Sequence, residues 1–460
     1  MAEKYDSIVI GAGPGGYVTA LRLAGKKQKV AVVEAKELGG TCLNRGCIPT
    51  KTLLHSSEIV ASVKHGKEHG ITAENLKVDL AAMIQRKNQV VAKLRGGVAG
   101  LLKGRKVDVY AGKGKLLDKN KVEVKLNDGK TAVLETNNII IATGSAATMP
   151  GFFPQDRSKV MTSDEILDLE KLPESLLIVG GGYIGCEFAT VFAELGTKVI
   201  VVEMLDRLIS MADKDLSDGL AKTFKKMGIE VLCGTAVEKM EVTKSGVKTT
   251  VKGGQVFDTT LALVCTGRRP MSEDLGLEKV GVVMEKGFIK IDEQCRTNIP
   301  NIFAIGDVTG KVQLAHVASR QGAVVTNVLT GTADREDYSI VPTAIYTHPE
   351  IGSVGLTEQQ AKDKGIKIKT AKFQMMASGM ALAYGETSGF VKLIANEEDD
   401  IIGAHLMCPH ASDLVQEIAV LMKAECTLHE LAATIHGHPT FAESLAEATE
   451  ILLGNPLHGH

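Results

Sequence analysis

Two cysteines five positions apart are the first residues of this sequence that could do chemistry. Cys42 and Cys47 lie in the segment Gly-Gly-Thr-Cys-Leu-Asn-Arg-Gly-Cys-Ile-Pro at residues 39–49. On an ideal helix they would be about 7.5 Å apart on divergent faces, whereas a disulfide requires Cα atoms closer than about 7 Å. They could therefore be bridged only across a distorted helix start, which Gly46 and Pro49 favour. A disulfide closing so short a loop adds little stability, and thiols near a helix N-terminus have depressed pKa values. We therefore interpret the pair as a redox device.

The other six cysteines stand singly in apolar or ordinary contexts, and we expect them to be small buried side chains. They are Cys186, Cys233, Cys265, Cys295, Cys408 and Cys426.

A histidine and a glutamate near the C-terminus are candidates for acid–base work. They occur in the segment Ile-His-Gly-His-Pro-Thr-Phe-Ala-Glu at residues 435–443. We expect Pro439 at or near a helix start and Glu443 one turn beyond His438, a spacing that lets the carboxylate meet the imidazole. The alternative is a pair of surface histidines without a catalytic role. No third His, Cys or acid falls at zinc spacing, so we expect no metal site.

A strand, a glycine turn, a helix and a second strand follow one another at the N-terminus. The β-like run 7–10 ends at Gly11, Gly13 and Gly16, a helical pattern follows, and the β run 30–33 ends in Glu34. These glycines match the dinucleotide fingerprint: a tight turn, close approach to a pyrophosphate, and helix–strand packing. The helix N-terminus supplies N–H donors for phosphates, and Glu34 is placed to accept from a ribose hydroxyl.

The same unit recurs later, with Gly180, Gly182 and Gly185 in the turn and Glu203 ending the second strand. The first glycine and the acid are 23 residues apart in both copies. One such turn is a weak signal, but two complete units predict two dinucleotides and electron transfer between them. An acid at this position repels a 2′-phosphate, and only Arg207 follows closely. The second site is therefore expected to prefer NAD over NADP.

Three further apolar strands end in residues suited to a ligand site. Residues 139–145 and 263–270 each pass through Thr-Gly and would close a nucleotide-binding lobe, and the strand ending at Ile305 delivers Asp307. Ligands of parallel sheets bind at the carboxyl ends of strands. The alternative for Asp307 is a helix N-cap, because residues 314–329 read as a helix. After about residue 345 the pattern changes. Residues 391–394 and 401–406 are expected to be strands of an antiparallel sheet and residues 411–424 a helix, which predicts a separate α+β domain.

The composition excludes several classes of protein. The chain has 460 residues, with 53 Lys and Arg against 55 Asp and Glu, for a net charge of −2. This balance gives no electrostatic footprint for nucleic acid or an anionic membrane. No apolar run approaches the roughly 18–20 residues of a membrane span, and the N-terminus leads into a strand without a signal peptide. We therefore expect a cytoplasmic protein of about three domains.

In combination, these motifs resemble the pyridine nucleotide–disulfide oxidoreductases, and within them the dihydrolipoamide dehydrogenases. The resemblance rests on both glycine turns, the cysteine segment, the Gly306-Asp307 strand end and the terminal His-x-His-Pro-Thr with its glutamate. It runs from Tyr5 to about Leu453. It implies an α/β fold of two Rossmann-like dinucleotide-binding domains, for FAD and NAD, and a C-terminal α+β dimerisation domain. The expected boundaries are 1–147 and 276–345 for the FAD domain, 148–275 for the NAD domain, and 346–460 for dimerisation.

The resemblance also implies roles for single residues. Cys42 would exchange with substrate, Cys47 would contact the flavin, and His438, steadied by Glu443, would be the acid–base. Lys51 would lie by the flavin, paired with Glu187. NAD would be held by the second turn, Glu203 and Gly267. FAD would be held by Gly11, Gly13, Gly16, Glu34, Thr41, Lys51, Gly114, Gly144, Asp307 and Ala315.

The activity so implied is oxidation of a protein-bound dihydrolipoyl group through a Cys42–Cys47 disulfide and FAD, with hydride transfer to NAD⁺. The partner would be the lipoylated carrier of a 2-oxoacid dehydrogenase complex or of glycine cleavage, and the enzyme would be a homodimer whose two subunits share each active site. The alternatives are a reductase of another small disulfide, similar to glutathione reductase, and a non-catalytic nucleotide-binding subunit. The sequence departs from the family pattern at Arg45, where many relatives carry valine, at Ala442, a frequent serine, and at Tyr183, which resembles the gating tyrosine of glutathione reductase.

Overall fold

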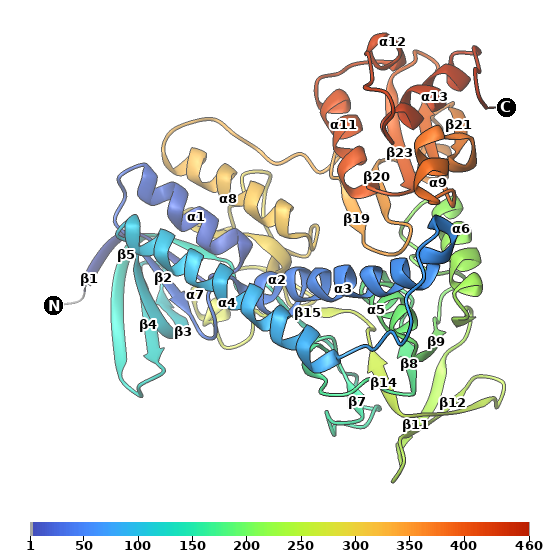
Figure 1. Cartoon of the computed structure of the whole chain (residues 1–460). Coiled ribbons are helices and arrows are strands. Elements are labelled where there is room, and N and C mark those ends of the chain that lie inside the picture. The colour runs from blue at the N-terminus through green and yellow to red at the C-terminus, as the bar shows by residue number, and fades with distance from the viewer. Residues whose placement is uncertain (1–2, 460) are drawn as a thin grey trace. The chain divides into compact units, whose positions relative to one another are not determined.

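The computed structural model describes residues 3–459, which divide into two compact units. The first unit comprises the chain up to Thr52, Ala81–Thr148 and Gly267–Tyr338. The second comprises Leu53–Leu80, Met149–Thr266 and the chain from Ser339 onward. Each unit is described separately below, and Figure 1 gives the element labels.

The first unit is built on a parallel sheet in the order β3-β2-β1-β5-β18, with β4 pairing antiparallel to β3 and β5. Strand β2 reads Val-Ala-Val-Val-Glu with its first four residues buried, as expected when both faces of a parallel sheet are covered. The strands are β1 (Glu3–Ile10), β2 (Val30–Glu34), β3 (Asp108–Asp118), β4 (Lys121–Leu126), β5 (Thr131–Ile141), β6 (Ser145–Ala147), β15 (Arg268–Pro270), β16 (Met284–Glu285), β17 (Phe288–Ile289) and β18 (Ile302–Ala304).

Helices α1 (Pro14–Gly25) and α8 (Ala315–Leu329) lie side by side in this unit (Figure 1). Glycines permit the close approach: a Cβ on Gly322 would lie 2.2 Å from the Thr19 hydroxyl, and one on Gly15 would lie 3.2 Å from the Ala318 Cβ. The other helices of this region are α2 (Gly40–Arg45), α3 (Cys47–His65, which continues into the second unit), α4 (Leu80–Gly104), α7 (Leu277–Val280) and η3 (Gly306–Thr309).

The second unit contains a five-stranded sheet in the order β10-β9-β8-β14-β7, in which every pairing is parallel. Helix α5 (Tyr183–Leu195) packs against β8 and β9 of this sheet and is buried on almost all sides. A small antiparallel sheet, β11-β12-β13, adjoins it in sequence. The remaining elements are β7 (Val160–Met161), β8 (Ser175–Val179), β9 (Lys198–Val202), β10 (Glu230–Leu232), β11 (Val237–Val242), β12 (Val247–Val251), β13 (Val256–Thr259), β14 (Leu261–Val264), α6 (Lys214–Lys226), η1 (Gly66–His69) and η2 (Ile166–Asp168).

The C-terminal part of the second unit is a five-stranded antiparallel sheet, β19-β20-β23-β22-β21, with helices beside it (Figure 1). This confirms the change of pattern predicted after residue 345, including the expected strands at β22 and β23 and the expected helix at α11. The elements are β19 (Thr343–Ile345), β20 (Ile351–Gly355), β21 (Lys369–Gln374), β22 (Phe390–Ala395), β23 (Ile401–Met407), α9 (Glu358–Asp363), η4 (Met375–Ala377), α10 (Gly379–Tyr384), α11 (Ala411–Lys423), α12 (Leu428–Ala433) and α13 (Glu443–Leu452).

The cysteines correct one expectation. Of the six predicted to be buried, Cys186, Cys295 and Cys408 are fully buried, but the other three are only partly buried. Among the described residues no cysteine forms a disulfide. No helix in the described range 3–459 is long and apolar enough to cross a membrane.

Candidate active site

The two glycine turns have the same backbone geometry, although they lie in different units. Gly11 and Gly180 have φ of +103° and +110°, values that favour glycine, and a Cβ there would lie 2.3 or 2.4 Å from a carbonyl oxygen of a neighbouring strand end. A Cβ on Gly16 or Gly185 would lie 1.9 or 2.0 Å from the carbonyl of the first glycine in its own turn. The outer glycines are therefore required by the turn itself.

The acids that end the second strands also repeat each other. Glu34 accepts hydrogen bonds from the amides of Ala12 at 2.7 Å and Lys36 at 2.8 Å. Glu203 accepts from Gly181 at 2.6 Å and Leu205 at 2.7 Å, the equivalent positions. Each carboxylate therefore lies against its own glycine turn, and the two sequence units are also equivalent in structure.

Four further glycines of the two sites, Gly13, Gly144, Gly182 and Gly267, face open space, as a bound dinucleotide requires. A Cβ on Gly144, Gly182 or Gly267 would meet no heavy atom within 4 Å, and one on Gly13 would meet only the Cα of Gly40 at 3.9 Å. The buried hydroxyl of Thr143, beside Gly11, has no hydrogen-bond partner among the residues that the structure describes. Open backbone and an unsatisfied polar atom together fit the dinucleotides that the sequence predicts.

The cysteine segment begins against the first glycine turn. The amide of Gly39 donates to the Ala12 carbonyl at 2.8 Å, and a Cβ on Gly40 would lie 2.6 Å from the Cα of Gly13. Helix α2 starts at Gly40, so Thr41 and Cys42 occupy its first turn. The fold therefore holds Cys42 next to the first dinucleotide turn.

Gly46 breaks the helix between the two cysteines, as the sequence predicted. It caps α2 with φ of −138° and ψ of −109°, and α3 begins at Cys47. A Cβ on Gly46 would lie 3.2 Å from the Thr41 carbonyl oxygen, so the break folds the chain back on α2. The two sulfurs are thereby brought within hydrogen-bonding range of each other.

The pKa of the Cys42 thiol is raised, which differs from the expectation for a thiol near a helix N-terminus. The main cause is the hydrogen bond that the thiol makes with Cys47, and burial adds to it. The positive charge of Lys51, one turn into α3, opposes the shift. In the reduced pair these contacts favour the thiol form of Cys42 over the thiolate.

Asp307 is not a helix N-cap. The N-cap residue of α8 is Leu314, without a side-chain hydrogen bond, and Asp307 lies in η3 directly after β18. Its carboxylate accepts a hydrogen bond from Ser145.

Two other predicted flavin contacts are also placed in the first unit. Ala315 is the first residue of α8, and Gly114 is buried on β3 against the side chains of Ile10 and Val33.

His438 and Glu443 meet in the second unit, with Nδ1 and Oε1 2.8 Å apart. The reason differs from the predicted helical spacing, because α13 begins only at Glu443 and Pro439 precedes it in a loop. The amide of Thr440 also donates to Glu443 at 2.7 Å, and together these two contacts lower the pKa of that carboxyl, the amide most. The His438 side chain is 81% exposed, so the imidazole faces solvent.

Two predicted pairs join residues of different units. Lys51 belongs to the first unit and Glu187 to the second. In the same way, the two cysteines belong to the first unit and His438 to the second. Both pairings therefore stay predictions. Glu187 is buried in α5 and accepts from the amide of Tyr346 at 3.1 Å, and Tyr183 is half-buried at the start of the same helix.

The sequence did not predict a cluster of charged and polar side chains around His348. Its members come from four segments that are distant in sequence. The imidazole lies 3.2 Å from both Glu194 and Glu386, and Glu194 also accepts from the Ser57 hydroxyl at 2.5 Å. The two carboxylates raise the pKa of His348 to about 10.

The cluster should make stability depend on pH in the alkaline range. An unfolded histidine titrates near pH 6.5, so the stabilisation is fully present below that pH and is lost as the pH rises towards 10. We expect His348→Gln to lower the Tm by about 2–4 °C at pH 6, with a smaller difference from the unmodified chain at pH 10. Calorimetry at both pH values measures it, with the exposed His429→Gln as control. A Tm difference that does not shrink at high pH contradicts the assignment.

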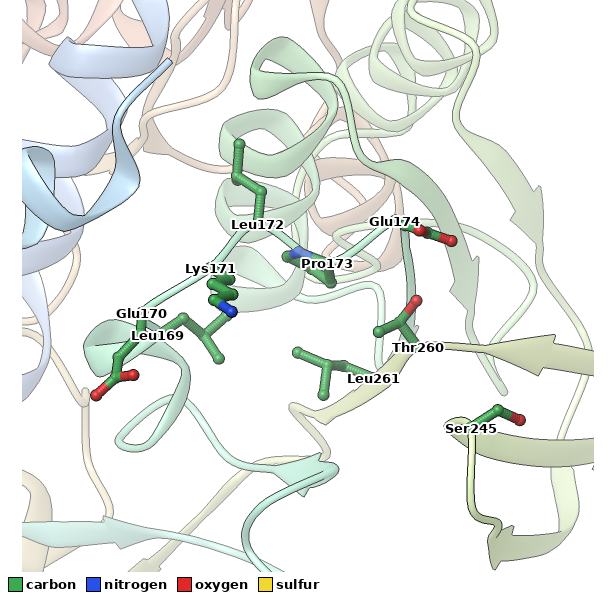
Figure 2. Close-up of a pocket in the computed structure, with 9 residues that line it drawn as sticks. All are labelled: Leu169, Glu170, Lys171, Leu172, Pro173, Glu174, Ser245, Thr260 and Leu261. Atoms are coloured by element: carbon green, nitrogen blue, oxygen red, sulfur yellow. The ribbon is translucent and has the colours of Figure 1, made fainter. Parts of the chain in front are cut away.

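A hollow of about 590 Å³ lies in the second unit but at the wrong end of its parallel sheet for a dinucleotide. It is lined by the 169–174 loop, Ser245, Thr260 and Leu261. Figure 2 shows Glu174 just before β8 and Leu261 at the start of β14, hence at the amino ends of these strands. The glycine turn follows the carboxyl end of β8, where ligands of such sheets bind.

Comparison with known proteins supplies the family. The family described as pyridine nucleotide-disulphide oxidoreductase matches residues 5–322, and its dimerisation domain matches residues 341–449. The chain belongs to the pyridine nucleotide-disulphide oxidoreductases. The expected fold class is thereby confirmed. The family's enzymes use FAD and NAD, in agreement with the two duplicated turns.

Relatives within the family match over their full length. The chain is 43% identical to the dihydrolipoyl dehydrogenase of Chlamydia muridarum, covering 100% of this chain and 99% of the relative. It is 42% identical to the dihydrolipoyl dehydrogenase of Geobacillus stearothermophilus, covering 99% and 98%. Among solved structures, LpdA from Mycobacterium tuberculosis superposes with a TM-score of 0.92 at 28% identity, covering 97% of this chain and 99% of that one. The flavoprotein disulfide reductase RclA from Escherichia coli superposes with a TM-score of 0.89 at 29% identity, covering 97% and 100%.

No group of three or more His, Cys, Asp or Glu side chains in the described part of the chain could hold a metal ion.

Proposed function

We propose that this protein is a dihydrolipoyl dehydrogenase that oxidises a protein-bound dihydrolipoyl group and passes the electrons to NAD⁺. The observation that carries the proposal is the cysteine helix starting directly against the first of two equivalent dinucleotide turns. Full-length relatives named dihydrolipoyl dehydrogenase support the same substrate. A flavin held at the first turn would accept two electrons and pass them on as a hydride to NAD⁺.

The chain's own residues have the chemistry for the thiol steps. A substrate thiolate attacks the Cys42 sulfur of the disulfide, which forms a mixed disulfide and releases Cys47 as a thiolate. His438 takes the proton of the second substrate thiol, which then displaces Cys42 and leaves the substrate as a disulfide. Because Nδ1 of His438 bonds Glu443, Nε2 is the nitrogen that receives the proton. The cysteine pair is left with the two electrons that the substrate gave up.

We further propose a cytoplasmic homodimer in which each subunit lends His438 to the other subunit's cysteines. The match to a dimerisation domain supports the dimer. The His438 side chain is exposed in one subunit, which agrees with a role at the cysteines of the other subunit. The lipoyl group would be carried by another protein, from a 2-oxoacid dehydrogenase complex or from glycine cleavage. The domain boundaries given above, Lys51 pairing with Glu187, and the individual cofactor contacts are part of the same proposal.

A direct assay tests the proposed activity. The purified protein should be yellow, should develop a long-wavelength absorption band when titrated with dithionite, and should reduce NAD⁺ with dihydrolipoamide. Reduction of glutathione disulfide with NADPH at a comparable kcat/KM would instead support the alternative reductase. A colourless protein without either activity would overturn both.

Glu203 is expected to select NAD⁺ at the second site. Its carboxylate lies against the turn, and the nearby Arg207 is directed to its own loop, where it donates to the Ser210 carbonyl at 3.0 Å. We expect Glu203→Ala to reduce the preference for NAD⁺ over NADP⁺ by roughly tenfold, the effect of losing about 1–3 kcal/mol of hydrogen bonding to a charged group. The ratio of the two kcat/KM values measures it. Glu230→Ala, an exposed glutamate on the adjacent β10, is the control, and an equal ratio in Glu203→Ala and the unmodified enzyme contradicts the assignment.

A further inference from the structure

Arg268 reaches the carboxylate of Asp307 through a serine. Its Nε donates to the Ser145 hydroxyl at 2.8 Å, and its Nη2 donates to the Ser145 carbonyl at 2.8 Å. The same hydroxyl donates to Oδ2 of Asp307, which lies 3.9 Å from Arg268 Nε. A hydroxyl has one proton to donate. Because the Ser145 oxygen accepts from Arg268, its own proton is oriented towards Asp307.

Ser145 and Arg268 lie where the chain leaves the first unit after Thr148 and returns to it at Gly267. Strands β6 and β15 pair antiparallel, with Ser145 opposite Pro270 and Arg268 opposite Ala147. The ribbon is extended by the amide of Thr148, which donates to the Gly267 carbonyl at 3.0 Å. Arg268 therefore lies on a strand paired with the strand that carries Ser145, directly after a glycine predicted to contact NAD.

The backbone that carries Asp307 is held independently. The amide of Gly306 donates to Oε1 of Gln321 at 2.6 Å, and that side chain is fully buried. With the backbone so fixed, the contact to Ser145 determines the rotation of the Asp307 carboxylate. Oδ2 is engaged, and Oδ1 has no hydrogen-bond partner within residues 3–459.

We propose that Arg268 is a positioning residue for the first dinucleotide site, which acts through Ser145 to present Oδ1 of Asp307 to a hydroxyl of the bound flavin nucleotide. The guanidinium fork is suited to this task because one side chain bonds both the hydroxyl and the carbonyl of Ser145. The Arg268 side chain is 15% exposed, and the charge it brings stays next to the carboxylate. The inference rests on the proposed role of Asp307 in holding FAD.

The test is titration of FAD into the apoprotein, which measures binding without turnover. We expect Arg268→Met to weaken FAD binding about tenfold, as expected when a hydrogen bond to a charged group is lost. Arg268→Lys should weaken it less, because one donating nitrogen and the positive charge remain. Arg269→Met is the matched control, since its neighbouring guanidinium is 52% exposed and pairs with Glu273. A dissociation constant in Arg268→Met equal to that in Arg269→Met overturns the proposal.

Ser145→Ala separates positioning from a general loss of stability, because it cuts the same connection without removing a charge. We expect it to weaken FAD binding comparably, and the double variant with Arg268→Met to be no weaker than the worse single variant. Additive losses would show that the two side chains act separately and would overturn the proposal. If the unmodified apoprotein does not bind FAD at all, the proposed function fails; if it binds but Arg268→Met binds equally well, only this inference fails.

Discussion

Cys42→Ser should lower the rate of dihydrolipoamide oxidation at least about a thousandfold. The nucleophilic exchange with substrate requires a sulfur at this position, and groups that act as a unit lose nearly the whole rate enhancement when one is removed. The dinucleotide turns do not depend on that sulfur, because they are held by backbone contacts and by Glu34 and Glu203. FAD content and the reduction of an artificial acceptor by NADH should therefore stay near the unmodified values.

Steady-state kcat with dihydrolipoamide, together with FAD stoichiometry, measures this effect. Cys426→Ser is the control, since that cysteine is partly buried in the C-terminal part of the second unit, outside the cysteine segment. More than a tenth of the unmodified rate in Cys42→Ser would mean that another group carries the exchange. Equal loss of the NADH-dependent reaction would mean that the substitution damaged the cofactor sites.

His438→Ala should reduce dihydrolipoamide oxidation by roughly 10²–10⁴, the usual contribution of a positioned general acid–base. The imidazole is oriented by Glu443 at 2.8 Å and is otherwise exposed, so its removal costs little packing. His458→Gln is a close control: that side chain is 71% exposed, and its Nδ1 lies 2.8 Å from Glu447. A similar loss in both variants would contradict a catalytic role for His438.

Mixed dimers test whether the site is shared. Homodimers of Cys47→Ser and of His438→Ala should each be nearly inactive. If each site combines the cysteines of one subunit with His438 of the other, an isolated heterodimer has one site with both lesions and one intact site. About half of the unmodified activity is then expected. Heterodimers as inactive as the parents would show that His438 serves its own chain.

The sequence by itself determined the features that repeat or that depend on local geometry. The two glycine turns could be predicted because their backbone requires a glycine at φ near +105° and a second glycine against the carbonyl of the first. Such a requirement places glycines at a fixed spacing in the sequence. The break at Gly46 was predicted on another local ground, because two cysteines five positions apart can approach each other only where the helix is distorted. The antiparallel character of the C-terminal part followed from its strand pattern.

The tertiary structure decided what depends on residues distant in sequence. It excluded the N-cap alternative for Asp307 and showed a carboxylate held through Ser145 and Arg268, in which Ser145 and Asp307 are 162 residues apart. It raised the pKa of Cys42 instead of lowering it, because the thiol hydrogen-bonds the second thiol and is partly buried. It also assembled the ion cluster of Glu194, His348 and Glu386. A sequence pattern indicates the conformation that its own backbone must adopt. The charges and hydrogen-bond partners around a side chain depend instead on the distant segments that pack against it.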